Sequence, residues 1–400
     1  MRRYKTYING EWFEGTSGIV LRSVDPSNNK ELGEIVQNSK EDVEYAIESA
    51  SRSFYKTREW RDLDVQQRND KLLKIADMIE SEIDEIAKTE SMDNGKPLRE
   101  AQADVDDAVH CFRYYAGLIR TPSGQTYNVN SNFGNMHSYT VKEPVGVCAL
   151  ITPWNFPFLM SVWKIAPALA AGNSIIFKPS SETVLSALKL FEILDKCDLP
   201  KGTANLVIGS GSTVGNLLAE SKKVDMITFT GSTSVGQGIM RAAAGNVKKI
   251  GLELGGKSPN IVFADTDIDK TVEWVMMGIF LNQGEVCCAG SRLIIEKSIK
   301  DKFLKKLVDK TDKLTLGAPL DNPDMGPLIS KKHMQDVLGY IEKGKAEGAK
   351  LLCGGYKCTD DDLVNGNFIK PAIFDDCTSD MSIVREEIFG PVLTVLTFET

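Results

Sequence analysis

The segment VGVCALITPWNFP, residues 145–157, begins with a short apolar run and ends in a polar turn that two prolines hold extended. Four more apolar runs follow it, and a helical pattern separates each from the next. The runs cover residues 174–177, 205–208, 226–230 and 250–254, and the helical patterns lie near 160–171, 182–196, 212–220 and 234–244. Buried strands that alternate with helices predict an α/β fold with a parallel, doubly wound sheet. Such sheets bind ligands at the carboxyl ends of their strands.

Residues before 145 show other patterns than the alternating strands and helices of 145–254, and residues after 254 begin a new one. Residues 1–120 are predicted to be mostly helical after a short start, and Ser39 to Asp42 resembles a capping box at the first helix. Two short alternating segments within residues 123–143 predict a hairpin. A second α/β pattern follows residue 254. Helices are expected near 40–50, 65–90, 98–119, 267–281, 299–313 and 331–347, and later strands at 293–295 and 392–398.

Composition excludes several classes of function. The 400 residues are 42% hydrophobic and 26% charged, which is typical of a globular protein. With 47 Lys and Arg against 55 Asp and Glu, the net charge of −8 does not favour nucleic-acid binding. No apolar run reaches the roughly 18 residues of a membrane helix. Eight cysteines are too few for a disulfide framework, so we expect a reduced, cytoplasmic protein. The three histidines show no metal-binding spacing, and no metal is predicted.

Two motifs contain candidate reactive groups. In GIFLNQGEVCCAGSR, residues 278–292, small residues surround Cys287, and a thiolate can attack a carbonyl carbon. In LELGGK, residues 252–257, the Glu253 carboxylate precedes two glycines and can act as a general base. The Asn155 amide can donate to an oxyanion. Taken singly, Cys287 is better explained as a buried core thiol, and Glu253 as a surface carboxylate before a turn.

Three strand-end motifs indicate nucleotide binding. They are FKPSSET at 177–183, GSGSTVG at 209–215 and FTGSTSVG at 229–236. The second has the spacing GxGxxxG rather than the GxGxxG dinucleotide fingerprint, so by itself it is weak evidence.

In this order and spacing, the motifs together resemble the NAD(P)-dependent aldehyde dehydrogenase superfamily, and FRYYAG at 112–117 resembles its betaine-aldehyde-type, broad-specificity branch. The resemblance extends from YINGEW, residues 7–12, to EEIFGPV, residues 386–392. It implies that an aldehyde is oxidised to a carboxylic acid with NAD or NADP. Cys287 would form a thiohemiacetal, Asn155 would stabilise the oxyanion, and Glu253 would activate the water that hydrolyses the thioester.

The resemblance also implies the remaining site residues. Cofactor contacts are expected at Ile151, Thr152, Pro153, Trp154, Lys178, Ser181, Gly211, Gly215, Phe229, Gly231, Ser232, Val235, Leu254, Glu387 and Phe389. The substrate channel is expected to include Phe156, Met160, Trp163 and Lys164.

It further implies a Rossmann-like cofactor domain (1–121 and 145–254), a hairpin that bridges subunits (122–144) and a catalytic domain (255–400). A homodimer or homotetramer is expected.

The chain departs from the family pattern in two ways. A glutamate usually lies three residues after the ribose-binding lysine, where this chain has Ser181. Loss of that carboxylate predicts that NADP is accepted, unless Glu182 takes its place. The strand pattern also continues to residue 400, and we expect full-length relatives to extend further. Two other interpretations stay open: a CoA-acylating or acyl-phosphate-reducing relative, and a catalytically silent binding or structural homologue.

Overall fold

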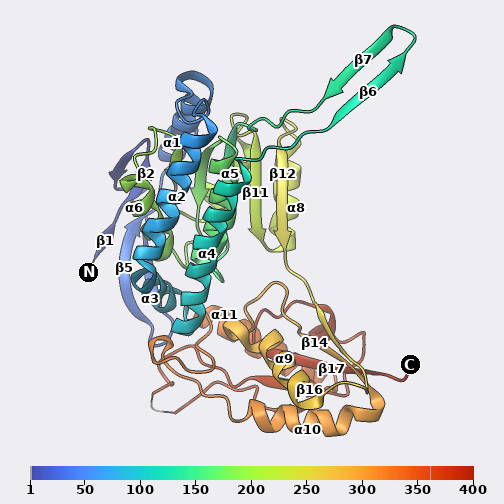
Figure 1. Cartoon of the computed structure of the whole chain (residues 1–400). Coiled ribbons are helices and arrows are strands. Elements are labelled where there is room, and N and C mark those ends of the chain that lie inside the picture. The colour runs from blue at the N-terminus through green and yellow to red at the C-terminus, as the bar shows by residue number, and fades with distance from the viewer. Residues whose placement is uncertain (1, 361) are drawn as a thin grey trace.

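The larger of two parallel sheets has seven strands in the order β12-β11-β8-β9-β10-β2-β3 (Figure 1). The computed structural model describes residues 2–360 and 362–400. The strands are β2 (Thr6–Ile8), β3 (Glu11–Phe13), β8 (Val147–Ile151), β9 (Ser174–Lys178), β10 (Ala204–Leu206), β11 (Met226–Gly231) and β12 (Lys249–Leu254). Strands β8 to β12 pair in parallel, which confirms the predicted α/β fold. The antiparallel β2 and β3 were not predicted, because three residues are too few to show a period.

The strand order creates a switch point between β8 and β11. From β8 the chain adds β9 and β10 on one side, then returns to place β11 and β12 on the other. The helices between them are α5 (Pro157–Ala170), α6 (Leu185–Lys196), α7 (Asn216–Glu220) and α8 (Thr233–Ala243), with a π-helical turn η2 (Gly211–Gly215) before α7. Open α/β sheets bind ligands in the crevice at such a point, beyond the carboxyl ends of the strands.

The N-terminal segment corrects two expectations. Residues before 37 form strands instead of a short start: β1 (Arg3–Tyr4), β4 (Val20–Asp25) and β5 (Lys30–Val36) make a three-stranded sheet. The single helix expected near 65–90 is two helices, because Glu82 leaves helical geometry at φ −112° and ψ 16°. Apolar spacing continues across this break and hides it. The helices are α1 (Lys40–Arg52), α2 (Val65–Ser81), α3 (Ile83–Asn94) and α4 (Leu98–Leu118), with η1 (Ser53–Thr57) after α1.

The capping box at Ser39 is confirmed. The Asp42 backbone N–H donates to Ser39 Oγ over 3.1 Å, and the Ser39 N–H donates to the Asp42 carboxylate over 2.9 Å. These two bonds satisfy donors that the first turn of α1 leaves free.

The second parallel sheet forms the other lobe in Figure 1, and its strand order is β13-β14-β17-β16-β15. Only β15 runs antiparallel to its neighbour. Its strands are β13 (Pro259–Val262), β14 (Arg292–Glu296), β15 (Lys350–Cys353), β16 (Ala372–Asp375) and β17 (Val392–Phe398). The helical segments are α9 (Ile268–Phe280), η3 (Leu281–Gly284), η4 (Lys297–Ile299), α10 (Lys300–Thr311), η5 (Pro319–Asp321), α11 (Lys331–Ala346) and α12 (Ser382–Arg385).

The predicted hairpin consists of β6 (Thr126–Ser131) and β7 (Gly134–Tyr139), and it projects away from both lobes (Figure 1). Apolar side chains on it are left in solvent, and Phe133 at its tip is 96% exposed. Two strands bury too little surface to be stable alone in water. Among the helices of residues 2–360 and 362–400, none has the length and apolarity that crossing a bilayer requires.

Candidate functional site

A cavity of about 490 Å³ lies where the switch point of the larger sheet meets two loops of the smaller one. Its lining includes twelve of the predicted residues: Pro153, Trp154, Asn155, Phe156, Met160, Trp163, Gly231, Ser232, Leu254, Cys287, Glu387 and Phe389. Leu159, Thr230, Gly255, Leu281, Val286 and Cys288 complete the wall. Segments more than a hundred residues apart in sequence therefore meet in one concave site, and concave sites are where proteins usually bind small molecules.

Asn155 lies four residues beyond the end of β8, and its side chain is buried. Its Nδ2 donates to the Glu285 carbonyl over 2.8 Å. The backbone carbonyl of Asn155 accepts a hydrogen bond from Nδ2 of Asn282 over 2.7 Å. A carboxamide nitrogen carries two hydrogens, so one N–H of Asn155 is left to donate to another acceptor.

Cys287 lies in the loop between α9 and β14. Two residues near the start of this loop adopt left-handed backbone geometry, Asn282 at φ 46° and Gln283 at φ 58°. The thiol of Cys287 is accessible to solvent. Burial by the cavity walls raises its pKa above the ordinary value, and the adjacent Cys288 raises it further. The thiol is therefore mostly protonated at neutral pH, and its use as a nucleophile requires a group that removes the proton.

Glu253 projects from β12, where it pairs with Thr230 of β11. Its side chain is exposed, and it is not among the lining residues of the cavity, although the next residue, Leu254, is. Lys164 on α5 donates to Thr228 Oγ1 over 2.9 Å. Burial lowers the pKa of Lys164 to about 8, and the negative charge of Glu253 partly opposes that change.

The loop before β17 presents Glu387 and Phe389 to the cavity. The Gly256 N–H donates to the Glu387 carboxylate over 3.3 Å, and burial raises the pKa of this carboxyl. A Cβ on Gly255 would lie 1.9 Å from Glu387 Oε2, so a larger residue there would displace the Glu387 carboxylate. Phe389 has a φ of 59°, and its ring contacts the Trp154 ring edge-on at 5.2 Å.

The other predicted residues lie outside this cavity. Lys178 ends β9, is buried, and donates from Nζ to the Pro179 carbonyl over 2.9 Å. Burial lowers its pKa to about 8. A Cβ on Gly215 would come within 3.9 Å of the Lys178 side chain, so these two positions adjoin. Ile151 and Phe229 are core residues, Val235 in the first turn of α8 donates its backbone N–H to Ser232 Oγ, and the remaining residues of this group are Thr152, Ser181 and Gly211.

Sequence reasoning missed the buried polar groups behind the cavity. Glu285 is fully buried, accepts from the Ile329 N–H over 3.0 Å, and has a pKa well above its ordinary value because burial disfavours the anion. The Nε2 atom of His333 lies 2.6 Å from the backbone carbonyl oxygen of Phe389. Lys96 is also fully buried. The one signal for Lys96 was the NGKP turn at 94–97, but charged residues in turns are normally exposed.

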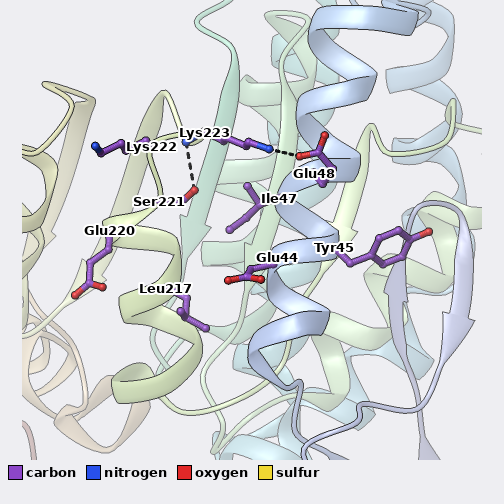
Figure 2. Close-up of a pocket in the computed structure, with 9 residues that line it drawn as sticks. All are labelled: Glu44, Tyr45, Ile47, Glu48, Leu217, Glu220, Ser221, Lys222 and Lys223. Carbon is purple, nitrogen blue, oxygen red and sulfur yellow. Dashed lines mark hydrogen bonds and ion pairs between the residues drawn. The ribbon is translucent and has the colours of Figure 1, made fainter.

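A separate groove of about 680 Å³ lies between α1 and α7 (Figure 2). Its lining residues include Tyr45, Glu48 and Lys223, and Lys223 forms an ion pair with Glu48. No predicted site residue lines this groove.

Comparisons with known proteins agree with this geometry. The model of the aldehyde dehydrogenase family matches residues 12–400. Betaine aldehyde dehydrogenase of Bacillus subtilis (strain 168) is 47% identical over 395 residues, which are 98% of this chain and 80% of that protein. Aminoaldehyde dehydrogenase 1, peroxisomal, of Pisum sativum is 44% identical over 98% of this chain and 79% of its own length.

A solved structure has the same fold. Betaine aldehyde dehydrogenase from Staphylococcus aureus, in complex with NAD+, matches with a TM-score of 0.96 and 42% identity, over 99% of this chain and 78% of that one. The chain therefore belongs to the aldehyde dehydrogenase family, whose members are oxidoreductases that act on aldehydes.

Proposed function

We propose that this protein oxidises an aldehyde to a carboxylic acid with NAD as the hydride acceptor, through a covalent intermediate on Cys287. The observation that carries the proposal is the single cavity that contains Cys287, Asn155, Glu387 and Phe389 at the switch point of the larger sheet.

The first half of the reaction would use Cys287 and Asn155. The Cys287 sulfur attacks the aldehyde carbon, and the carbonyl oxygen becomes an oxyanion. That oxyanion accepts from the free N–H of Asn155 and from the Cys287 backbone N–H. Because burial raises the pKa of the thiol, its proton must pass to a base as the C–S bond forms. The bound dinucleotide supplies the acceptor for the hydride that leaves the former aldehyde carbon.

The second half would use Glu253. Loss of the hydride leaves a thioester on Cys287, and Glu253 takes a proton from the water that attacks it. The carboxylic acid then departs and the thiol is regenerated. Glu253 is exposed one residue before Leu254, which lines the cavity, so its side chain has the freedom to turn toward the thioester.

The residues at the switch point suit a dinucleotide. Thr152 Oγ1 and Thr230 Oγ1, at the ends of β8 and β11, are buried and have no hydrogen-bond partner within residues 2–360 and 362–400. The N-terminus of α8 begins after Ser232, and backbone N–H groups there attract phosphate. In this proposal Lys178 holds the adenosine ribose and Glu387 the nicotinamide ribose. The Staphylococcus aureus structure that this chain resembles is described with NAD+ bound.

We propose in addition that NADP is accepted. Ser181 stands where a carboxylate would repel a 2′-phosphate, and the nearby Lys178 can pair with that phosphate. The rival is Glu182, which is exposed and directly follows Ser181.

We propose that the chain has the three parts predicted from sequence. They are a cofactor domain (1–121 and 145–254), a bridging hairpin (122–144) and a catalytic domain (255–400). We propose that the exposed hairpin pairs with a second copy in a homodimer or homotetramer. Light scattering of wild type and of Phe133→Ser at equal concentration tests this, since loss of the exposed tip should weaken association.

The decisive experiment measures formation of reduced dinucleotide at 340 nm with betaine aldehyde and with propanal. Activity with either aldehyde in the absence of CoA and phosphate supports the proposal, and Cys287→Ser serves as the matched control. Activity that requires CoA or phosphate would point to the acylating alternative. No reduction of either cofactor would point to a silent homologue.

A further inference from the structure

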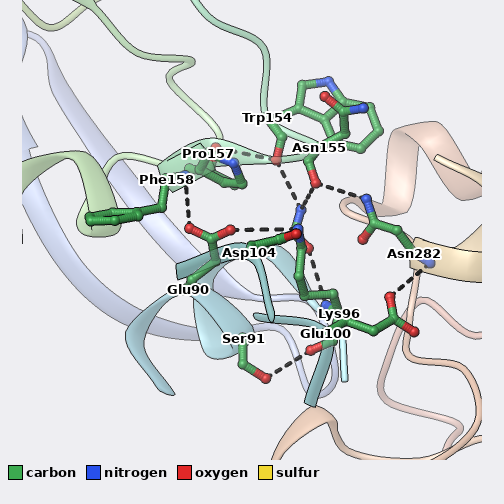
Figure 3. A network of polar contacts seen from close by, with 12 residues as sticks. Glu90, Ser91, Lys96, Glu100, Asp104, Trp154, Asn155, Pro157, Phe158 and Asn282 are labelled. Carbon is green, nitrogen blue, oxygen red and sulfur yellow. Dashed lines mark hydrogen bonds and ion pairs between the residues drawn. The ribbon is translucent and has the colours of Figure 1, made fainter. Parts of the chain in front are cut away.

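A buried cluster of charged residues lies beneath the cavity wall (Figure 3). Lys96 follows Gly95, whose φ of 100° ends α3, and its side chain is fully buried. Its Nζ bonds the Asp104 carboxylate, lies 3.5 Å from Glu90 and stands 4.1 Å from the centre of the Phe156 ring. Burial disfavours the charged form of Lys96, but the two carboxylates outweigh this and raise its pKa. The two carboxylates therefore favour the cationic form of Lys96.

The cluster and its neighbours on α3 hold the chain on both sides of Asn155. Glu90 Oε2, beside Lys96, accepts from the Phe158 backbone N–H over 2.8 Å. Asn94 Nδ2 donates to the Trp154 carbonyl over 2.9 Å. The segment that carries the Asn155 amide is thereby fixed at its start and at its end.

The same region holds the Cys287 loop. Glu100, one turn before Asp104 on α4, accepts from the Asn282 backbone N–H over 2.9 Å. The Asn282 side chain then donates to the Asn155 carbonyl over 2.7 Å and approaches the Glu285 carbonyl at 3.4 Å. Asn282, whose backbone has a positive φ, thus links the Asn155 segment directly to the Cys287 loop (Figure 3).

We propose that Lys96 and Asn282 are positioning residues that set the placement of the Asn155 amide relative to the Cys287 thiol. This inference rests on the proposed function, in which those two groups act on one carbonyl. Asn155 follows a strand of the larger sheet and Cys287 precedes a strand of the smaller one, so no shared ladder holds them in register. The buried contacts take over that task.

A cluster of ions suits this role better than apolar packing would. Buried ion pairs contribute little net stability, because desolvation offsets the attraction between the charges. Hydrogen bonds are directional, however, and a fully satisfied buried network specifies one arrangement of its members. A displacement of about 1 Å between reacting groups can cost about 100-fold in rate.

The test compares Asn282→Ala and Lys96→Met with Ser91→Ala as the matched control. Ser91 is buried in the same turn and donates to the Lys96 carbonyl over 2.8 Å. Its hydrogen bonds within residues 2–360 and 362–400 include neither the Asn155 segment nor the Cys287 loop. An effect that comes only from removing a buried polar side chain in this region should therefore lower the rates of Ser91→Ala as well.

Two readouts are measured at a temperature where circular dichroism shows each variant folded. The first is kcat/KM for the aldehyde, with NAD affinity followed by fluorescence. The second is the burst of p-nitrophenolate from p-nitrophenyl acetate, which requires acylation of Cys287 and an oxyanion donor but no cofactor. We expect Asn282→Ala and Lys96→Met to lower both rates about 10- to 100-fold. NAD affinity should stay within about twofold, and Ser91→Ala should retain wild-type rates.

Rates within twofold of wild type in Asn282→Ala would overturn the inference, and so would an equal loss in Ser91→Ala. If Lys96→Met fails to fold, Asn282→Ala decides alone. The ester readout separates this inference from the proposed function. Wild type that acylates but reduces no dinucleotide refutes the proposed oxidation only, whereas an active wild type with unaffected variants refutes the positioning role only. Wild type inactive in both assays refutes both.

Discussion

The two parallel sheets contribute to one cavity in different ways. Trp154, Ser232 and Leu254 lie at or just beyond the ends of β8, β11 and β12 in the larger sheet. The smaller sheet contributes Cys287 and Phe389 from loops that precede its strands β14 and β17.

The backbone of these two groups differs accordingly. Strands β8, β11 and β12 are held by continuous parallel ladders, so the residues at their ends have little freedom. The loops of the smaller sheet include Asn282, Gln283 and Phe389, all non-glycine residues with positive φ. Such geometry costs energy and persists only where surrounding contacts impose it. A substitution at a strand end should therefore leave the backbone in place. The backbone of the loops, in contrast, depends on side-chain contacts from other parts of the chain.

The largest effect is expected on the loop side, at the nucleophile. Cys287→Ser should lower kcat by at least about 10⁴-fold, because an alcohol is a far weaker nucleophile than a thiolate. Steady-state reduction of NAD measures this. The neighbouring Cys288→Ser is the control and should keep most of the activity. If Cys288→Ser is inactive while Cys287→Ser is not, the nucleophile has been assigned to the wrong thiol.

The next effect is expected on the strand side, at β12. Glu253→Gln should still reduce about one equivalent of cofactor in a burst, whereas steady turnover falls about 10²- to 10⁴-fold because the thioester lacks a base. Stopped-flow absorbance separates the two phases. Glu253 is exposed, so the midpoint of thermal unfolding should shift by less than about 2 °C. Normal turnover in this variant would remove Glu253 from the mechanism.

Cofactor choice provides a smaller test of the strand side, beyond β9. Loss of a hydrogen bond to a charged acceptor costs about 1.5–3 kcal/mol, or roughly 10- to 150-fold in affinity. Ser181 should therefore leave kcat/KM for NADP at least comparable to that for NAD, and Ser181→Glu should restore a preference for NAD. Glu182→Gln is the control. A wild-type preference for NAD of tens of fold that Glu182→Gln abolishes would assign the discrimination to Glu182.

The smallest effect concerns pH. The Lys178 ammonium is charged below its lowered pKa of about 8 and neutral above it. NADP binding should therefore weaken as pH rises from 7 to 9, by about tenfold at most, because the 2′-phosphate loses its cationic partner. NAD, which lacks that phosphate, should change less. Parallel titrations by fluorescence measure both. An equal pH dependence for the two cofactors would contradict a phosphate contact at Lys178.

Much of the fold follows from local sequence. Apolar runs that alternate with helical patterns over 145–254 predicted the parallel strands, and Ser39 predicted its own capping box. These features depend on residues close together in the chain, so sequence reasoning finds them. The same reasoning missed β2 and β3, which are too short to show a period, and the helix break at Glu82, which the apolar spacing hides.

The site, like the fold, has features that local sequence predicts and features that it does not. The strand-end motifs at 152–157 and 229–236 indicated residues that line the cavity, because the carboxyl edge of a parallel sheet is a property of its strand order. Sequence alone did not show that Lys96 is a buried cation beneath Phe156, nor that Asn282 joins Asn155 to the Cys287 loop. Those contacts join the turn between α3 and α4 to the segment after β8, and that segment to η3 before β14, and only the packing of the complete chain brings them together.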